Sequence, residues 1–199
     1  MNKVITISRE YGAGGHSIGR QVAEELGIPF YDKTIVNETA KASGLDPDLI
    51  RAEEEDVSKT GAILRSICSS SVYYYDTQET IREVQKAVIR KIAQEGPCVI
   101  LGRCADAILR ETEIETLNVF IHADDIHRAM RVGEMLETTN ATEIQRTIAK
   151  KDASRRNYYN RYTGNKWGLI SNYHLALDSG ILGYDTCVKI IVAAAKAGE

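Results

Sequence analysis

The 199-residue chain has no apolar run long enough to span a bilayer, no signal peptide and no paired cysteines. Its four cysteines, Cys68, Cys98, Cys104 and Cys187, are scattered and form no C-x-x-C motif. This spacing indicates reduced thiols and argues against a disulfide framework or a zinc site. We therefore expect a cytoplasmic protein with no membrane partner.

The sequence also lacks an excess of charge of one sign. It carries 25 lysines and arginines against 28 aspartates and glutamates, a formal net charge of −3. This balance argues against broad binding to nucleic acid or to an anionic membrane, while a local basic site stays open. Neither internal repeats nor a low-complexity linker occurs. With 43% hydrophobic and 27% charged residues, the chain is typical of a single globular domain over residues 1–199.

The N-terminal stretch combines a strand, a glycine loop and a helix. Residues 4–8, VITIS, are mostly β-branched, as in a strand buried on both faces. Gly12, Gly14 and Gly15 follow within four residues, and from Ser17 apolar residues recur at helical spacing. Such a loop points backbone N–H groups and a helix N-terminus at one place, which favours an anion. The alternative is a tight turn whose glycines serve packing only.

The loop departs from the Walker A pattern, G-x-x-x-x-G-K-[ST]. With Gly14 on the second glycine, Arg9 falls on the first glycine and Gly15 falls on the lysine. His16 comes next, and Ser17 lies one place beyond. The lysine that normally reaches the terminal phosphates is therefore missing, although the glycines still predict an anion cradle.

Further short strands and helices alternate along the chain. The segments that read as strands are 28–31, 98–101, 118–122 and 173–178. The segments that read as helices are 80–94, 124–136, 143–162 and 184–196, and residues 33–95 look mostly helical. This alternation predicts an α/β fold, a doubly wound parallel sheet of about five strands flanked by helices.

Two charged residues follow predicted strands, and ligands of such sheets gather at the carboxyl ends of the strands. Asp32 follows the segment 28–31. It is either the N-cap of a helix that starts near Lys33, or a carboxylate that holds Mg²⁺ through water or orients a phosphoryl acceptor. Arg103 follows the segment 98–101. An arginine there suits a bidentate phosphate contact, and a structural ion pair is the alternative.

The helix predicted over 143–162 carries a basic cluster. Lys151, Arg155 and Tyr158 recur at spacings of four and three, so they share a face, and Asp152 lies on the adjoining flank. In an acidic protein this cluster favours a polyphosphate over nucleic acid, and a solvated helix face is the alternative. The run Tyr73–Tyr75 is interpreted as a packing or interface patch, with base stacking by one ring as the alternative.

Nearly the whole chain resembles the cytidylate kinase-like branch of the P-loop nucleoside monophosphate kinases. The stretches that carry the resemblance are ISREYGAGGHSIGRQVAEELGIPFYD at 7–32, VILGRCADAIL at 99–109, FIHADDIHRAMRV at 120–132, KKDASRRNYYNRYTGNKWG at 150–168 and LALDSG at 175–180. The resemblance implies a helical acceptor-binding insertion over about 33–95 and a lid over about 132–160.

The resemblance also implies which residues bind the substrates. The residues implied for the phosphates of ATP are Gly12, Ala13, Gly14, Gly15, His16 and Ser17. Those implied for the acceptor are Arg103, Asp152 and Arg155, with the aspartate on the sugar and the arginines on phosphate. Ser17 and Asp32 would hold Mg²⁺.

Catalysis, on the same resemblance, falls to Arg128, Arg131 and Asp32. The two arginines lead into the lid and would neutralise the transferring phosphoryl group. Because the Walker A lysine is missing, Arg9, His16 or Arg20 would have to supply its charge.

These roles predict ATP- and Mg²⁺-dependent phosphoryl transfer to a nucleoside monophosphate, with CMP or dCMP as the first choice. One alternative is a kinase of another small acceptor on the same scaffold. The other is a nucleotide-binding regulatory protein without catalysis, which the missing lysine favours. The expected partners are nucleotide substrates, with neither nucleic acid nor membrane, and the sequence leaves open a homodimer.

Overall fold

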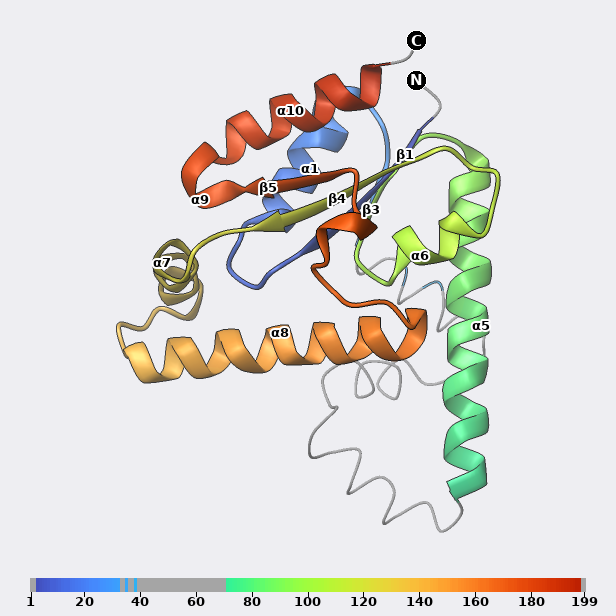
Figure 1. Ribbon diagram of the computed structural model, residues 1–199, viewed down its shortest axis with the longest axis horizontal. Helices are drawn as coiled ribbons and strands as arrows, with labels where there is room; N and C mark the ends of the chain where they lie inside the picture. The colour runs from blue at the N-terminus through green and yellow to red at the C-terminus, as the bar shows by residue number, and fades with distance from the viewer. Residues whose placement is uncertain (1–2, 33–34, 36–37, 39–70, 198–199) are drawn as a thin grey trace.

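A five-stranded parallel sheet runs through the protein, of which the computed structural model describes residues 3–32, 35, 38 and 71–197, with the backbone alone over 71–81 (Figure 1). The strand order is β2-β3-β1-β4-β5, and every pairing is parallel. The strands are β1 (Val4–Arg9), β2 (Phe30–Tyr31), β3 (Val99–Leu101), β4 (Thr116–His122) and β5 (Leu175–Asp178). The predicted doubly wound parallel sheet is confirmed.

Helices cover both faces of this sheet. The helices on one face are α1 (Gly15–Leu26) and α10 (Tyr184–Lys196), and those on the other are α5 (Ser71–Glu95) and α6 (Ala105–Arg110). Two more helices, α7 (Asp125–Leu136) and α8 (Ala141–Thr163), lie beyond the carboxyl ends of the strands. The short elements are α9 (Ser179–Leu182) and a 3₁₀ turn, η1 (Ile170–Asn172). Within the described residues no helix is long and apolar enough to cross a membrane.

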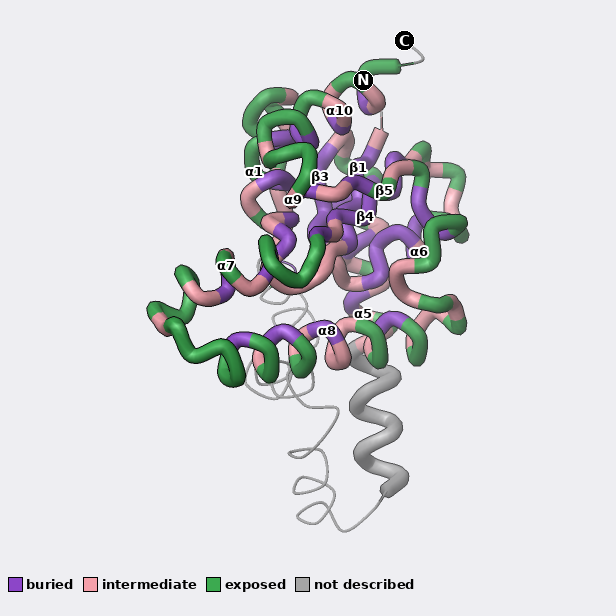
Figure 2. Tube along the Cα trace, turned by 60° about the vertical axis from the view of Figure 1, so that its left-hand side comes forward, coloured by how far each residue is buried: buried purple, intermediate pink, exposed green. Residues whose placement is uncertain are grey.

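The central strand β1 is buried on both faces, as its β-branched composition predicts. Ile5 and Ile7 have no exposed surface and pack in one core with Val22 of α1 and Ile191 of α10. Val4 belongs to a second core, on the α5 and α6 face. Each such buried side chain contributes about 1.5–3 kcal/mol relative to an exposed one. Figure 2 shows the buried residues gathered in the strands, while α7 and α8 are mostly intermediate or exposed.

Side-chain caps fix where α7 and α8 begin. Asp124 accepts hydrogen bonds from the backbone N–H groups of Ile126 and His127, both at 2.9 Å. Asn140 accepts in the same way from Thr142 and Glu143. Each cap contributes about 1 kcal/mol to its helix.

Most predicted elements are confirmed, with shifted bounds. The helices expected over 124–136, 143–162 and 184–196 correspond to α7, α8 and α10. The helix expected over 80–94 is longer, because α5 begins at Ser71. The sequence did not predict α6 and α9, which are too short to show a clear helical period. The helix expected near Lys33 and the side chains of Tyr73–Tyr75 lie outside the described residues, and the acceptor-side and lid regions stay predictions.

Candidate active site

The glycine loop between β1 and α1 needs glycine at two positions. Gly12 and Gly14 have φ angles of 85° and 74°, in the left-handed region that suits glycine. A Cβ atom at Gly12 would also lie 2.9 Å from the carbonyl oxygen of Arg128. One at Gly14 would overlap the ring of Tyr184. These glycines therefore serve packing as well as the turn.

Backbone N–H groups at the end of this loop are open to a ligand. Among the described residues, nothing accepts a hydrogen bond from the N–H groups of Gly14, Gly15 or His16; Gly14 is the N-cap of α1, and the other two begin the helix. The buried hydroxyl of Ser179 fixes the loop from behind by donating to the carbonyl oxygen of Ala13 at 2.7 Å. Free N–H groups and the positive end of the helix dipole together favour an anion. This is the geometry that the sequence predicts for a phosphate cradle.

A cluster that we call the loop clamp, Glu10, Tyr11, Arg128 and Asp152, ties the loop to α7 and α8. Asp152 accepts a hydrogen bond from the backbone N–H of Tyr11 at 2.8 Å and pairs with Arg128 through its other oxygen. Arg128 also pairs with Glu10 at 3.1 Å, and its Nε donates to the carbonyl oxygen of Tyr11 at 3.0 Å. Both Arg128 and Asp152 are 6% exposed. The clamp therefore holds the backbone of the loop between two helices.

Of the six residues predicted for the acceptor or for catalysis, three do not line the open pocket at the ends of β1 and β3. Asp152 and Arg128 are engaged with each other in the loop clamp. Arg131 pairs with Glu134 at 3.6 Å on the surface of α7. The acceptor-binding role of Asp152 and the catalytic roles of both arginines stay predictions.

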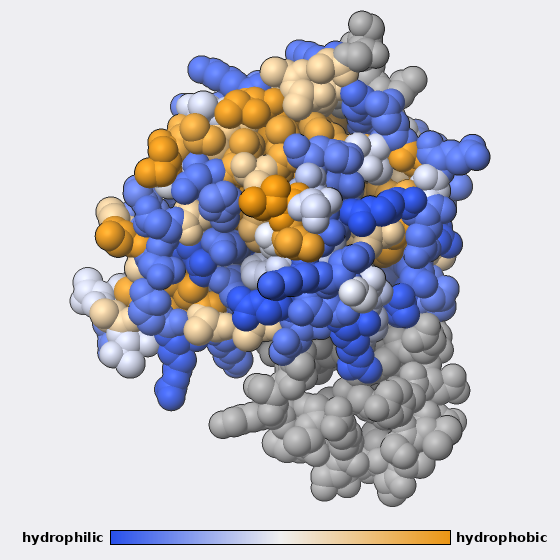
Figure 3. Space-filling model, in the orientation of Figure 1, coloured by the Kyte–Doolittle hydropathy of each residue, from blue (hydrophilic) through white to orange (hydrophobic). Residues whose placement is uncertain are grey.

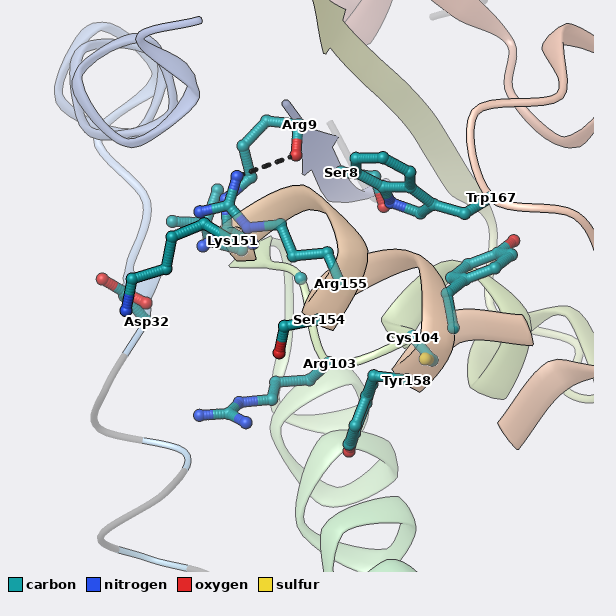
Figure 4. Close-up of a pocket in the computed structure, with 13 residues that line it drawn as sticks. Ser8, Arg9, Asp32, Arg103, Cys104, Lys151, Ser154, Arg155, Tyr158 and Trp167 are labelled. Carbon is teal, nitrogen blue, oxygen red and sulfur yellow. Dashed lines mark hydrogen bonds between the residues drawn. The ribbon is translucent and has the colours of Figure 1, made fainter. Parts of the chain in front are cut away.

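A pocket of about 200 Å³ opens at the carboxyl ends of β1 and β3. Four cationic side chains line it: Arg9 from β1, Arg103 after β3, and Lys151 and Arg155 from α8. Among the described residues that line it, Asp32 is the only carboxylate. Figure 4 shows these residues around the same hollow, reached from the end of β1, the end of β3 and α8. Such a lining favours a ligand with more than one negative charge.

One face of α8 forms a wall of this pocket. Lys151, Arg155 and Tyr158 all line it, which confirms that they share a face. Arg155 donates from Nη1 to the backbone oxygen of Arg9 at 3.1 Å (Figure 4). Its guanidinium also lies 5.3 Å from the centre of the Tyr11 ring. The surface over α8 is predominantly hydrophilic, whereas hydrophobic residues gather near α9 and α10 (Figure 3).

The cations of the pocket disfavour one another. Burial is the main cause that lowers the pKa of Arg9 to about 9. The positive charges of Arg155 and Arg103 also lower this pKa, whereas the carboxylate of Asp32 raises it. The guanidinium therefore stays charged at neutral pH. Burial also lowers the pKa of Arg103 and that of Arg155. A bound anion would relieve this repulsion, because it adds opposite charge within a few ångströms.

The residues predicted for Mg²⁺ lie near the loop. Asp32 lines the pocket and pairs with Nε2 of His16 at 3.2 Å, and Ser17 is half-buried in the first turn of α1. No group of three or more histidine, cysteine, aspartate or glutamate residues gathers in the described part of the chain. This arrangement fits a Mg²⁺ ion carried by substrate phosphates, which takes only one or two protein carboxylates. The Mg²⁺ roles of Ser17 and Asp32 stay predictions.

A second cavity of about 450 Å³ adjoins the first and shares Arg103, Cys104 and Tyr158 with it. It lies among α5, α6 and the end of α8. Within the described part of its lining, the cationic side chains are Arg82, Lys86, Arg103, Arg110 and Arg161, and the one carboxylate is Glu111. That carboxylate pairs with Arg90 at 3.0 Å. The two cavities together form a cationic region far larger than the sequence cluster on α8.

The sequence offered Arg9 only as one of three candidates for the charge of the missing lysine, and it did not point to Arg82 or Arg110. Arg9 ends a buried strand just as Arg103 follows one, so the same rule would have placed both at the sheet edge. Motif alignment instead assigned Arg9 to a glycine position. Arg82 and Arg110 carried no signal, because their place in the second cavity depends on how α5 and α6 pack against α8.

Solved structures with a similar fold include proteins of several kinds. An uncharacterized protein from Eubacterium ventriosum ATCC 27560 is 26% identical, with a TM-score of 0.74 over 98% of this chain and 99% of that chain. A shikimate kinase from Bacteroides thetaiotaomicron is 12% identical, with a TM-score of 0.56 over 98% and 99% of the two chains. A gluconokinase from Sinorhizobium meliloti 1021 is 16% identical, with a TM-score of 0.54 over 96% and 90%. The two kinases share the fold with this chain.

No curated protein sequence matches this chain. The sequence model of the cytidylate kinase-like family matches residues 4–181, which include the glycine loop, the pocket and the loop clamp. The chain therefore belongs to the cytidylate kinase-like family.

Proposed function

We propose that this protein is an ATP- and Mg²⁺-dependent kinase that transfers a phosphoryl group to a nucleoside monophosphate, with CMP or dCMP as the first choice. The observation that carries the proposal is a juxtaposition. The open N–H groups of Gly14, Gly15 and His16 lie at the end of β1, where the four-cation pocket also begins. A donor phosphate and an acceptor phosphate would thus meet at one edge of the sheet.

In this proposal the glycine loop binds the donor and the pocket binds the acceptor. The N–H groups of the loop hold the phosphates of ATP, and Arg103 and Arg155 hold the phosphate of the acceptor. An oxygen of that phosphate attacks the γ-phosphorus in line, the bond from that phosphorus to the β,γ-bridging oxygen breaks, and ADP leaves. Because such transfers depend mainly on positioning and charge neutralisation, a cationic pocket suits them. Ser17 and Asp32 would hold Mg²⁺, which would supply positive charge to offset that of the donor phosphates.

A kinase of another small acidic acceptor is the second candidate. The second cavity favours it, because its described lining carries five cationic side chains and one carboxylate, which suits an acceptor with a further acidic group. A neutral nucleobase would form no ion pair with these cationic side chains. The fold is shared with a shikimate kinase and a gluconokinase.

A panel of acceptors separates these functions. ADP release is measured with Mg²⁺-ATP against CMP, dCMP, UMP, AMP, GMP, shikimate and gluconate, with a control that contains no acceptor. Fastest turnover with CMP or dCMP supports the first proposal, and fastest turnover with shikimate or gluconate supports the second. ATP binding without turnover on any acceptor would contradict both and indicate a regulatory nucleotide-binding protein.

Paired variants on α8 link turnover to the pocket. Arg155 lines the pocket, whereas Arg146 is an exposed cation on the same helix. We expect Arg155→Ala to raise the KM for the acceptor while Arg146→Ala leaves it unchanged. Equal effects would remove α8 from the acceptor site.

A further inference from the structure

Gly15 has no side chain because Arg9 occupies the space. A Cβ atom on Gly15 would lie 2.7 Å from Cβ of Arg9 and 2.9 Å from its Cγ, closer than real Cβ atoms approach. Gly15 is not among the residues with positive φ, so its backbone conformation does not call for glycine. A lysine at position 15 and the observed arginine at position 9 therefore exclude each other.

The side chain of Arg9 leads from the donor loop toward the acceptor pocket. Its stem lies against Gly15, and its Nη1 reaches Gly102, where it would overlap an added Cβ. The residue lines the pocket beside Arg103. Among the described residues, its guanidinium has neither a salt bridge nor a hydrogen bond. A cation is thus positioned between the two proposed phosphate sites and is available to a ligand.

The other candidates for this charge are placed less well. His16 is half-exposed and pairs with Asp32 at 3.2 Å. Arg20 is exposed on the outer side of α1 and does not line the pocket. Only Arg9 therefore combines contact with the loop and access to the pocket.

We propose that Arg9 replaces the Walker A lysine by a reciprocal exchange, in which the cation comes from the first motif position and the glycine from the seventh. Its guanidinium donates hydrogen bonds to the γ-phosphoryl oxygens of ATP and stays with the group as it passes to the acceptor. No proton moves, because the arginine keeps its charge throughout. This inference rests on the proposed phosphoryl transfer.

Exchanging the two residues tests the inference directly. Arg9→Gly combined with Gly15→Lys recreates the ordinary order of glycine and lysine in the motif. We expect Arg9→Gly alone to lower kcat by about 10²–10³-fold, as losing one preorganised charge donor does. Gly15→Lys alone should also be impaired, because the lysine meets the Arg9 stem. The double variant should recover at least about tenfold over Arg9→Gly, since a lysine then reaches the same phosphates.

Binding of ATP and ADP, measured by calorimetry, gives a readout that a merely structural arginine would not move. We expect Arg9→Gly and Arg9→Ala to weaken ATP binding by about 10- to 150-fold, the effect of one charged hydrogen bond, and to leave the binding of ADP, which lacks the γ-phosphoryl group, unchanged. Arg9→Ala is included because glycine at this position would itself destabilise strand β1. Arg20→Ala is the matched control and should behave as the wild type.

The outcomes distinguish this inference from the proposed function. Variants at Arg9 that bind ATP and turn over within about threefold of the wild type would overturn the inference alone, as would a double variant no better than Arg9→Gly. A wild-type protein that binds ATP without turnover would overturn the proposed kinase function. The ATP affinities of the wild type and the Arg9 variants would still show whether Arg9 contacts the phosphates. A wild-type protein that does not bind ATP would overturn both.

Discussion

Asp152→Asn tests whether the loop clamp holds the glycine loop. The change keeps the shape of the side chain and removes its charge. Asparagine can still accept the hydrogen bond from the Tyr11 N–H, so the main loss is the ion pair with Arg128. Arg128 keeps Glu10 at 3.1 Å, although Glu10 is the more exposed of its two partners.

The expected loss of stability follows from burial. Removing one partner of a buried ion pair costs about 3–5 kcal/mol, because the other charge stays buried. The remaining contact with Glu10 places Asp152→Asn near the lower end, at about 3 kcal/mol. A chain of this size loses about 2–4 °C of Tm per kcal/mol, so Tm should fall by about 6–12 °C.

Thermal and urea unfolding measure this effect against a matched control. Glu134→Gln removes an exposed carboxylate that pairs with Arg131 at 3.6 Å, and it should change stability by less than about 1 kcal/mol. A Tm for Asp152→Asn within about 2 °C of the wild type would refute the reasoning.

Replacing both partners separates stability from loop geometry. Arg128→Met with Asp152→Leu should recover most of the lost stability, since apolar pairs often replace buried ion pairs at little cost. This double variant should still bind ATP more weakly than the wild type, because the Tyr11 N–H then has no acceptor on α8. Recovery of full ATP affinity in this double variant would show that the clamp does not position the loop.

Three further predictions concern the pocket, a buried acid and the back of the loop. Arg103→Ala should raise the acceptor KM at least about tenfold in steady-state kinetics with the fold retained, and an unchanged KM would remove Arg103 from the site. Burial raises the pKa of Asp106 above its usual range. The unfolded state therefore loses its proton first, and this residue costs stability as the pH rises through the folded pKa. In urea titrations the free energy of unfolding of Asp106→Asn should therefore rise relative to that of the wild type between pH 4 and pH 7. A difference between the two proteins that does not change with pH would contradict this. Ser179→Ala leaves the Ala13 carbonyl without its donor and should cost about 1–3 kcal/mol in the same assay, against near-zero for the exposed Ser171→Ala.

Composition was enough to predict the sheet. Strands buried on both faces are mostly apolar and rich in valine, isoleucine and leucine, as residues 4–8, 98–101 and 118–122 are. Helix α6 escaped prediction because it has six residues and follows Cys104, which adopts a left-handed conformation with φ of 55°. No propensity rule foresees such a residue in that position.

The site was predictable where it depends on strand ends and on helix spacing. Arg103 was found by the first rule, and Lys151 and Arg155 by the second. The pairing of Arg128 with Asp152 was not predictable, because the two residues are 24 apart and lie on different helices. The environment of Arg9 was equally hidden, since only the folded loop brings its stem against Gly15.

The arrangement of α8 has a consequence for how the two proposed substrates would affect each other. A single turn of this helix carries Asp152, which holds the loop backbone, and Lys151 and Arg155, which face the pocket. Any displacement of that turn by one ligand therefore reaches the binding site of the other. Thermodynamic linkage then requires that if the donor tightens binding of the acceptor by some factor, the acceptor tightens binding of the donor by the same factor.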